Sequence, residues 1–333
     1  MNKLDTQALQ LFLQTPKTIV VIPHRNPDGD AIGSTLGWAH FLRHSGHQVQ
    51  VISPNDFPDF LGWLPGSSDI LCYEKNRAHG HDLIVKADLV CTLDFNAFHR
   101  VGIMEESLKE VKAPFLMIDH HQEPGNYAQF LFSNTQYGST CEMVFDVIES
   151  LGQKQHVNQV IATCLYTGIM TDSGSFRFPS TTARTHRVVA ELIEAGAPNS
   201  LIHQQIYDSS SFHRLQLLGC ALSNLKIFPN KNTAYTTLSQ AEMSRFKAEK
   251  GDTEGFVNYG LSIKGIHLAA IFIENQEEGI IKISFRSKGD VDVNQLSRAH
   301  FDGGGHINAA GGRSKTSLAE TVALFEQILN LKP

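Results

Sequence analysis

The chain has 333 residues, 41% of them hydrophobic and 19% charged, and its formal net charge at pH 7 is −6. These values are typical of a globular protein with a large core, and the length predicts two domains. No apolar run approaches the roughly 20 residues that a membrane-spanning helix needs. Residues 1–5 are not followed by the apolar core of a signal peptide. We therefore expect a cytoplasmic protein without membrane contacts.

The acidic balance also bears on nucleic-acid partners. Long duplexes are held by many contacts between Lys or Arg and phosphates, which favours a basic surface. This chain lacks such a bias. We expect no long duplex nucleic acid as a partner, and any nucleotide substrate should be short and held in a cleft.

The five cysteines form no Cys-x-x-Cys pair, and their total is odd. Cys91, Cys141 and Cys164 lie among apolar neighbours, which predicts buried free thiols and neither disulfides nor a zinc site.

The first predicted strand leads into the most informative stretch of the chain. Residues 18–22 form a β-branched apolar run, and the apolar residues of 31–44 recur at helical spacing. Between them lies the Pro- and Gly-containing turn His24-Arg25-Asn26-Pro27-Asp28-Gly29-Asp30. Ligands of open α/β sheets bind where strands end in this way. We expect the side chains of His24, Asp28 and Asp30 to point at one spot.

Strands and helices then alternate. A short helix is predicted at 4–14, further strands at 48–52, 87–93 and 114–118, and helices at 139–151, 158–171 and 182–195. This alternation predicts a parallel doubly wound sheet. After 196–198 the pattern changes to a mostly helical region, 200–226, which includes the helix 212–225. Strand-like runs at 233–237, 268–272 and 280–285, a Gly-rich loop at 302–312 and a helix at 317–331 follow.

The predicted fold class is therefore α/β with two lobes. The expected domains are an α/β domain at 1–190, a helical linker at 191–215 and a smaller α/β domain at 216–333.

Acidic and imidazole side chains follow three of the predicted strands of the first lobe, the first of which leads into the turn at 24–30. Asp94 ends the strand 87–93, Asp119-His120-His121 ends the strand 114–118, and Asp172 lies where a helix runs into a Gly/Ser turn. In a parallel sheet these ends meet at one edge, where the carboxylates would repel one another without cations. Imidazole with carboxylate suits Mn, Fe or Zn, and carboxylate alone suits Mg or Mn. Two ions about 3.5–4 Å apart need a bridging carboxylate and several terminal ligands, which this edge can supply.

Simpler interpretations exist for single features. Asn-Pro-Asp-Gly is a good turn sequence by itself. Arg184, at the start of a helix, could contact substrate but is more typical of a surface charge. Phe57, Phe60 and Trp63 are interpreted as packing residues, with base stacking as the alternative.

Taken together, these motifs resemble the DHH phosphoesterase superfamily and follow its order. They are the His-x-x-x-Asp-x-Asp turn, a lone Asp, Asp-His-His and a later Asp. Downstream, Ser284-Phe285-Arg286-Ser287 and the stretch from Asp302 to Gly311 resemble the family's C-terminal substrate-binding domain. The resemblance covers essentially the whole chain and is greatest to the bacterial oligoribonuclease branch.

The resemblance implies a role for each residue. His24 and Asp28 would bind one Mn²⁺, and Asp30, His120 and Asp172 would bind the other, with Asp94 as the bridge. Asp119 would orient a metal-binding imidazole, and His121 would face the substrate phosphate or the leaving group. Mg²⁺ or Co²⁺ are expected substitutes. Asn96 departs from the small hydroxyl residue expected near that position.

The second lobe is expected to hold the substrate. Gly303-Gly304-Gly305 lets backbone N–H groups approach a phosphate, and the absence of a following Lys-Ser/Thr excludes a Walker loop. Arg286 is a candidate for phosphate recognition or base stacking, with a solvated strand residue as the alternative. His306 is a candidate for the same phosphate.

The resemblance implies hydrolysis of short single-stranded RNA, about two to five nucleotides long, to mononucleotides. It also implies hydrolysis of 3′-phosphoadenosine 5′-phosphate to AMP and phosphate, by water activated between two metal ions. The alternatives are the same chemistry on linear or cyclic dinucleotides, or on pyrophosphate or polyphosphate. A non-enzymatic nucleotide sensor is disfavoured by the complete ligand set. The oligomeric state stays open, and a homodimer is compatible with the sequence.

Overall fold

The computed structural model describes residues 3–331, in two compact units. The first unit extends to Ser209 and the second begins at Ser210. This division falls inside the range 191–215 that was predicted as a helical linker.

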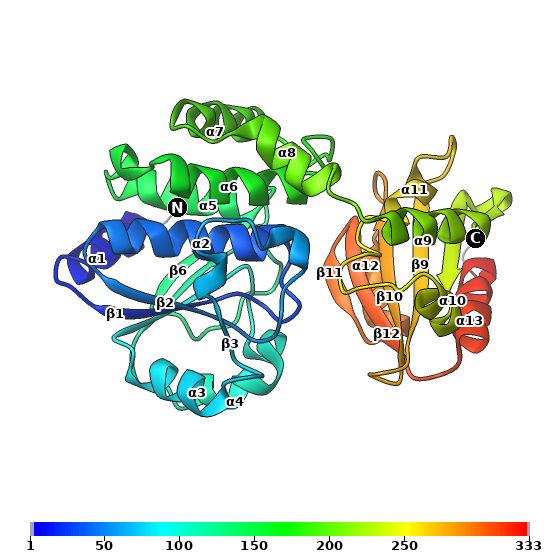
Figure 1. The fold of residues 1–333 in the computed structure, drawn as a ribbon, viewed down its shortest axis with the longest axis horizontal. Coiled ribbons are helices and arrows are strands. Elements are labelled where there is room, and N and C mark those ends of the chain that lie inside the picture. Colours follow the sequence, from blue (N-terminus) through cyan, green and yellow to red (C-terminus); the bar gives the residue numbers. More distant parts are fainter. Residues whose placement is uncertain (1–2, 332–333) are drawn as a thin grey trace. The chain divides into compact units, whose positions relative to one another are not determined.

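The first unit is built from alternating strands and helices (Figure 1). Its strands are β1 (Thr18–Ile22), β2 (Gln48–Ser53), β3 (Leu71–Cys72), β4 (Leu89–Leu93), β5 (Phe115–Asp119) and β6 (Phe130–Ser133). Its helices are α1 (Lys3–Phe12), α2 (Gly29–His44), α3 (Arg77–Lys86), α4 (Glu105–Lys109), α5 (Thr140–Ser150), α6 (Gln159–Asp172), α7 (Ala183–Glu194) and α8 (Asn199–Tyr207). Short 3₁₀ helices occupy connections: η1 (Asp59–Leu61), η2 (Ser67–Asp69), η3 (Phe98–Met104) and η4 (Lys154–His156).

The six strands form one parallel sheet in the order β3-β2-β1-β4-β5-β6. This confirms the doubly wound α/β prediction. The order reverses between β1 and β4, and ligand crevices of such sheets open at that point. The sequence did not indicate β3 and β6, because two and four residues are too short to show a strand period.

Helices cover both faces of this sheet: α2, α5 and α6 on one face, α3 and α4 on the other (Figure 1). The alternation of side chains along β1 explains the two layers. Ile19 and Val21 belong to the core formed with α2, α5 and α6, whereas Val20 and Ile22 pack in the core formed with α3 and α4. Phe57, Phe60 and Trp63 pack against the first of these cores, as predicted.

Small residues bring α2 and α6 into close contact. A Cβ atom at Gly33 would lie 2.6 Å from the carbonyl oxygen of Cys164, and one at Gly37 would lie 2.6 Å from the Leu165 side chain. At the end of the same contact, a Cβ at Gly168 would lie 2.9 Å from Asp30 Oδ1. Because α2 begins at the acidic turn and α6 ends at Asp172, this packing fixes the separation of two predicted ligands.

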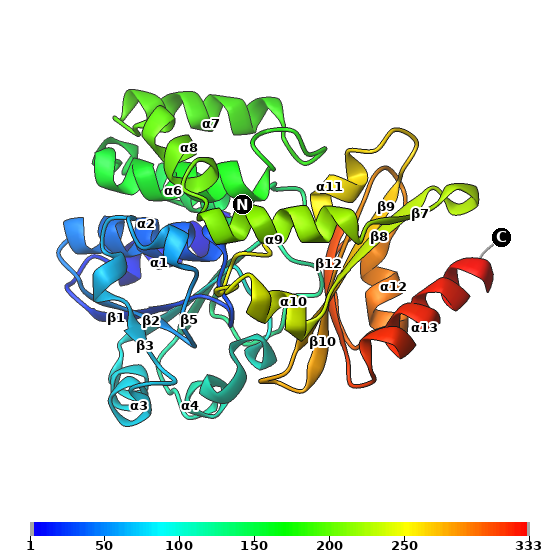
Figure 2. The same cartoon turned by 45° about the vertical axis from the view of Figure 1, so that its right-hand side comes forward.

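The second unit is a mixed sheet with helices on both faces (Figure 2). Its strands are β7 (Lys226–Phe228), β8 (Thr233–Leu238), β9 (Leu268–Asn275), β10 (Ile280–Ser287), β11 (Gly304–His306) and β12 (Ala309–Ser314), in the order β11-β12-β10-β9-β8-β7. Its helices are α9 (Phe212–Ser223), α10 (Gln240–Arg245), α11 (Val257–Leu261), α12 (Val293–His300) and α13 (Leu318–Leu331), with a 3₁₀ helix η5 (Pro229–Lys231). Along β9, Leu268, Ala270 and Phe272 pack with α12 and α13, whereas Ala269, Ile271 and Ile273 pack with α9 and α11.

The prediction of a Gly-rich loop at 302–312 is wrong in part, because β11 and the first half of β12 form a hairpin there. Ala and Gly have low strand propensity, so no strand pattern is visible in this part of the sequence. Hydrogen bonds between strands stabilise this hairpin, since β12 pairs with β10 on one side and with β11 on the other.

Cys91, Cys141 and Cys164 are buried free thiols, as predicted. Among residues 3–331, no helix combines the length and the hydropathy that crossing a membrane requires.

The close contact between α2 and α6 gives a stability prediction. We expect Gly33→Ala to lower the free energy of unfolding of the first unit by about 1–3 kcal/mol, because the new methyl group meets a backbone oxygen that cannot move aside. Calorimetric melting measures this loss. Gly219→Ala in α9 is the control, since a Cβ at that position would meet no neighbouring atom within 4 Å; this change should stabilise by about 0.5–1 kcal/mol. Equal melting of Gly33→Ala and the wild type would contradict the role of this contact.

Candidate active site

The turn after β1 is held by its own polar residues. Asp28 is the N-cap of α2, and its Oδ1 accepts the N–H groups of Asp30 at 3.1 Å and Ala31 at 3.0 Å. The side chains of Asn26 and Asn55 are hydrogen-bonded, with Nδ2 of Asn55 2.7 Å from Oδ1 of Asn26. Asp28 is therefore a capping residue whose second oxygen, Oδ2, remains directed at His24, 4.0 Å from Nε2. The turn and ligand interpretations of this sequence are compatible.

His24, Asp28 and Asp94 form a first donor group, with ligand atoms within 4.8 Å of one another. Nδ1 of His24 lies 2.9 Å from the carbonyl oxygen of Arg25, to which it donates. This bond fixes the tautomer and places on Nε2 the lone pair that can bind a cation.

Asp30, His120 and Asp172 form a second donor group of the same size. Nδ1 of His120 donates to the carbonyl oxygen of Tyr137 at 3.2 Å, so again Nε2 carries the lone pair that a cation needs. That atom lies 3.8 Å from Oδ2 of Asp30 and 3.6 Å from Oδ2 of Asp172.

Asp94, a member of the first donor group, also contacts the second. Its Oδ2 lies 3.5 Å from Nε2 of His24, and its Oδ1 lies 3.4 Å from Nε2 of His120. The residue is only 2% exposed and has a φ of 64°, in a region that non-glycine residues rarely occupy. The structure thus directs one carboxylate oxygen at each group.

The donor atoms fit divalent cations. Two ligands that are each about 2.1 Å from one octahedral ion lie about 3 Å apart. The separations of 3.4–3.8 Å between Nε2 of the two imidazoles and the carboxylate oxygens of Asp30, Asp94 and Asp172 need only small adjustments to reach this spacing. Nitrogen and oxygen donors together suit Mn²⁺ and related ions.

The charges of the two donor groups also favour bound cations. Burial disfavours the protonated form of His24 and His120, but their contacts with Asp94 and the neighbouring carboxylates outweigh burial and raise both pKa values. Burial and the charges of Asp94 and Asp172 raise the pKa of Asp30 well above its usual range. The pKa of Asp94 is lowered despite burial, because His120 and His24 stabilise its charge. Without cations, protons must neutralise this cluster.

The Asp119 carboxylate holds His121. Oδ1 of Asp119 lies 2.7 Å from Nδ1 of His121, and Oδ2 accepts the His121 backbone N–H at 3.1 Å. The imidazole that Asp119 orients is thus that of His121, whereas His120, the imidazole predicted to bind metal, is held by Tyr137. Burial lowers the pKa of His121, which favours its neutral form. In that form its Nε2 carries a lone pair that can accept a proton or bind a ligand.

Asn96 forms hydrogen bonds at the position where a small hydroxyl residue was expected. Its amide donates to the carbonyl oxygen of Gln122 and, at 3.4 Å, to that of Glu123. Asn96 therefore holds the loop that follows His121.

Two residues near the donor groups were not indicated by the sequence. The carbonyl oxygen of Arg100, in η3, accepts the backbone N–H of Arg25 at 2.8 Å. The positive charge of Arg100 acts to lower the pKa of His121 and opposes the rise in the pKa of His24. Thr140 contacts the carboxylates of Asp30 and Asp94. Neither belongs to a motif that the sequence singled out, although 139–151 was predicted as a helix.

Arg184 is a structural residue. Its guanidinium forms ion pairs with Asp146 and Glu149 and so joins α7 to α5, with the Glu149 contact at 2.6 Å. The surface-charge interpretation is the better of the two.

In the second unit, Arg286 lies on β10 and His306 lies on β11, the two strands that flank β12. Both pair with Ala309, Arg286 across β10–β12 and His306 across β11–β12. Directly paired residues of antiparallel strands point to the same face, so both side chains leave the same face of the sheet.

The glycine segment beside them is tightly constrained. A Cβ at Gly303 would collide with the carbonyl oxygen of Gly311, and Gly305 has a φ of 149°. The N–H of Gly305 donates to Oδ1 of Asn294 at 2.9 Å, and Nε of Arg298 donates to the same oxygen at 3.2 Å. Asn294 and Arg298 thus support the segment 303–306, and the sequence had not indicated either of them.

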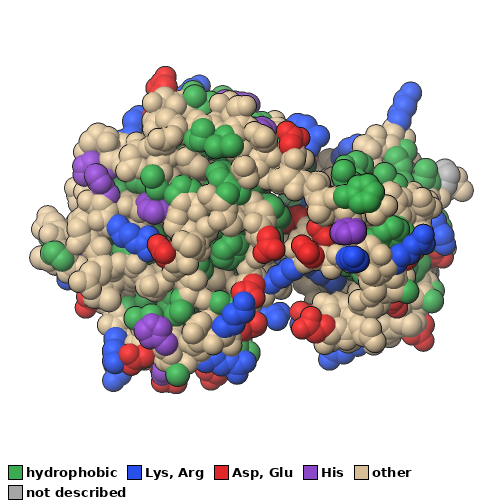
Figure 3. All heavy atoms as spheres, in the orientation of Figure 1, with side chains coloured by type: hydrophobic (Ala, Val, Ile, Leu, Met, Phe, Trp, Pro, Cys, Tyr) green, Lys and Arg blue, Asp and Glu red, His purple; other side chains and the backbone are tan. Residues whose placement is uncertain are grey.

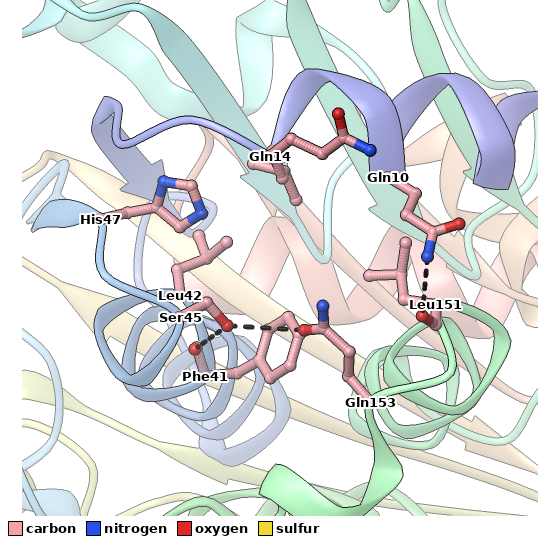
Figure 4. Close-up of a pocket in the computed structure, with 9 residues that line it drawn as sticks. Gln10, Gln14, Phe41, Leu42, Ser45, His47, Leu151 and Gln153 are labelled. Atoms are coloured by element: carbon pink, nitrogen blue, oxygen red, sulfur yellow. Dashed lines mark hydrogen bonds between the residues drawn. The ribbon is translucent and has the colours of Figure 1, made fainter.

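A cavity of about 130 Å³ lies elsewhere in the first unit (Figure 4). Ser45 and His47, next to the amino end of β2, lie on its wall, and Nε2 of Gln10 donates across it to the carbonyl oxygen of Leu151 at 3.4 Å. The lining residues are Gln10, Leu13, Gln14, Phe41, Leu42, Ser45, His47, Leu151 and Gln153. None of the predicted site residues is among them, so this cavity is separate from the donor groups.

The surface charges are mixed. On the face drawn in Figure 3, basic and acidic side chains are interspersed. This distribution agrees with the net charge of −6.

The chain is similar to known proteins over most of its length. The model of the DHH family, N-terminal domain, matches residues 18–169, and the model of the DHHA1 domain matches residues 230–331. The bifunctional oligoribonuclease and PAP phosphatase NrnA of Thermus thermophilus is 30% identical over 89% of this chain and 84% of its own length. The probable bifunctional oligoribonuclease and PAP phosphatase NrnA of Streptococcus mutans is 28% identical over 94% of each chain.

A solved structure shares the whole fold. The crystal structure of an exopolyphosphatase-related protein from Bacteroides fragilis is 39% identical, has a TM-score of 0.94 and matches over 98% of this chain and 96% of its own. With the two domain models in order and relatives of this similarity over most of its length, the chain belongs to the DHH family of metal-dependent phosphoesterases.

Proposed function

We propose that the protein is a Mn²⁺-dependent phosphoesterase that hydrolyses short oligoribonucleotides to mononucleotides and 3′-phosphoadenosine 5′-phosphate to AMP and phosphate. The proposal includes two metal ions in the site. The observation that carries it is the position of Asp94, whose two carboxylate oxygens face two separate imidazoles at 3.5 and 3.4 Å. One carboxylate between two donor groups is the arrangement that a pair of bridged ions requires. The substrates are supported by relatives named oligoribonuclease and PAP phosphatase.

Each donor group would hold one ion. His24 and Asp28 would bind the first, Asp30, His120 and Asp172 the second, and Asp94 both. When bound, such ions lower the pKa of a coordinated water and offset charge on phosphoryl oxygens. Mg²⁺ or Co²⁺ would substitute for Mn²⁺ in the same nitrogen and oxygen donor set.

The remaining roles belong to the chain's own side chains. Since Asp119 occupies Nδ1 of His121, Nε2 is the atom of His121 that would meet the phosphate or the leaving group. In the second unit, Arg286 would pair with a phosphate through its planar guanidinium, and His306 would contact the same anion. Backbone N–H groups of Gly303, Gly304 and Gly305 would add to this site. Such contacts suit a substrate of few phosphates, in keeping with the mixed surface charge (Figure 3).

The substrate assignment predicts Mn²⁺-dependent turnover of a labelled RNA dinucleotide and of 3′-phosphoadenosine 5′-phosphate, abolished by chelator and restored by Mn²⁺. Liquid chromatography of the products measures both reactions. Cyclic di-AMP and pyrophosphate are the comparison substrates, because they require the same chemistry. Faster hydrolysis of either, without turnover of the two proposed substrates, would reject the substrate assignment and keep the metal-dependent chemistry.

The bridging role of Asp94 predicts that Asp94→Asn lowers kcat about 1000-fold or more on both substrates, because an amide cannot supply two anionic oxygens. Steady-state kinetics measures the loss, and circular dichroism checks the fold. Asp82→Asn is the matched control, since Asp82 is an exposed carboxylate paired with Lys86 at 2.5 Å. Activity within a factor of two of wild type in Asp94→Asn would refute the bridging assignment.

The substrate role of Arg286 predicts that Arg286→Ala lowers kcat/KM by about 10–100-fold, the value of one charge-assisted contact with a phosphate. The control is Arg313→Ala, because the guanidinium of Arg313 already pairs with Asp302 at 2.7 Å. Kinetics on the dinucleotide measures both variants. If kcat/KM falls as much in Arg313→Ala as in Arg286→Ala, the loss reflects a general change in charge, and the proposed contact of Arg286 with phosphate is wrong.

A further inference from the structure

Thr140 is hydrogen-bonded to two of the predicted metal ligands. It is the first residue of α5 and is fully buried. Its backbone N–H donates to Oδ2 of Asp30 at 2.6 Å, and its hydroxyl donates to Oδ1 of Asp94 at 2.9 Å. The next amide, that of Cys141, donates to Oδ1 of Asp30 at 2.9 Å. Three donors from two consecutive residues therefore hold two buried carboxylates.

The start of α5 explains why these donors are available. The first amides of a helix have no partner inside the helix. Ser139 is the N-cap and accepts the N–H of Glu142 at 3.1 Å, while the amides of Thr140 and Cys141 point outward to Asp30. From the other side, α6 approaches Asp30 so closely that a Cβ at Gly168 would lie 2.9 Å from its Oδ1. Asp30 is thus held in one orientation between two helices.

The hydroxyl of Thr140 contacts one particular oxygen of Asp94. Oδ1, which accepts from Thr140, is the oxygen 3.4 Å from Nε2 of His120, in the second donor group. The other oxygen, Oδ2, lies 3.5 Å from Nε2 of His24 in the first donor group. Thr140 therefore holds Asp30, a member of the second donor group, and the one oxygen of Asp94 that faces this group.

We propose that Thr140 is a positioning residue that prepares the second donor group, and not the first, for its cation. This inference rests on the proposed two-metal function and adds a difference between the two donor groups. The hydroxyl of Thr140 fixes the oxygen of Asp94 that faces His120. A ligand that is already oriented loses less conformational freedom on binding. Removing hydrogen-bond partners of metal ligands typically weakens metal binding about 10–100-fold.

Thr140→Val isolates the hydroxyl. Valine has nearly the same shape as threonine, and the backbone N–H that donates to Asp30 remains. We expect wild type to bind two Mn²⁺ per chain, and Thr140→Val to bind one of them about 10–100-fold more weakly with the other unchanged. Thr140→Ser keeps the hydroxyl and should restore both affinities. Calorimetric titration of metal-free protein, with Mn²⁺ electron paramagnetic resonance to count free ion, measures this without substrate or turnover.

Thr167→Val is the matched control. Thr167 is also buried, but its hydroxyl donates to the carbonyl oxygen of Thr163 within α6 at 2.8 Å and contacts no predicted ligand. It should bind two ions with wild-type affinity. Two unchanged affinities in Thr140→Val, or equal weakening in Thr167→Val, would overturn the proposal. A wild-type protein that binds one ion would instead reject the two-metal function itself, which is a separate result.

Discussion

The dominant constraint in the first unit is the repulsion between buried carboxylates at the carboxyl edge of its sheet. Asp30 and Asp94 are almost completely inaccessible, and Asp172 lies 3.6 Å from the same imidazole that Asp94 contacts. Such groups are tolerated only with compensating charge or hydrogen-bond donors. The structure supplies the donors through the start of α5 and through His24 and His120. Each of these imidazoles also donates from Nδ1 to a backbone carbonyl oxygen, so its orientation is fixed.

Separate elements deliver these groups to one edge of the sheet. The strand order reverses between β1 and β4, where open α/β sheets bind their ligands, and β5 lies next to β4. The glycine contacts between α2 and α6 set the distance from Asp30 to Asp172, because each helix carries its proposed ligand at the end nearest the turn. Close packing of small residues thus serves both stability and the geometry of the site. A change in the α2–α6 spacing would displace two ligands together.

Much of this was predictable from the sequence because it follows from local rules. A β-branched run that ends in His or Asp identifies a strand and its functional end, and parallel strands bring such ends together. The contacts of Asp119 and Thr140 were not predictable in this way. Whether Asp119 orients His120 or His121 depends on the turn after β5, and Thr140 reaches Asp30 across 110 residues of chain. The hairpin β11–β12 was missed for a related reason, since its glycines and alanines are strand residues only because β12 pairs with β10 on one side and with β11 on the other.

Asp30 and Asp94 show how position gives one residue type two electrostatic properties. Asp94 lies between two imidazoles, which lower its pKa, whereas Asp30 faces Asp94 and Asp172, whose charges raise its pKa together with burial. In the absence of cations, His24 and His120 retain protons to a higher pH than usual, because the carboxylates around them favour the charged form. A cation at each of the proposed sites would need the Nε2 lone pair of its imidazole, so binding would displace these protons. As pH falls through the raised pKa values, protons compete more strongly for the same atoms. The arrangement that makes the edge attractive to divalent cations therefore also makes it attractive to protons. Thr140 favours the cation, because its hydrogen bonds keep the carboxylate oxygens of Asp30 and Asp94 in place without occupying the imidazoles.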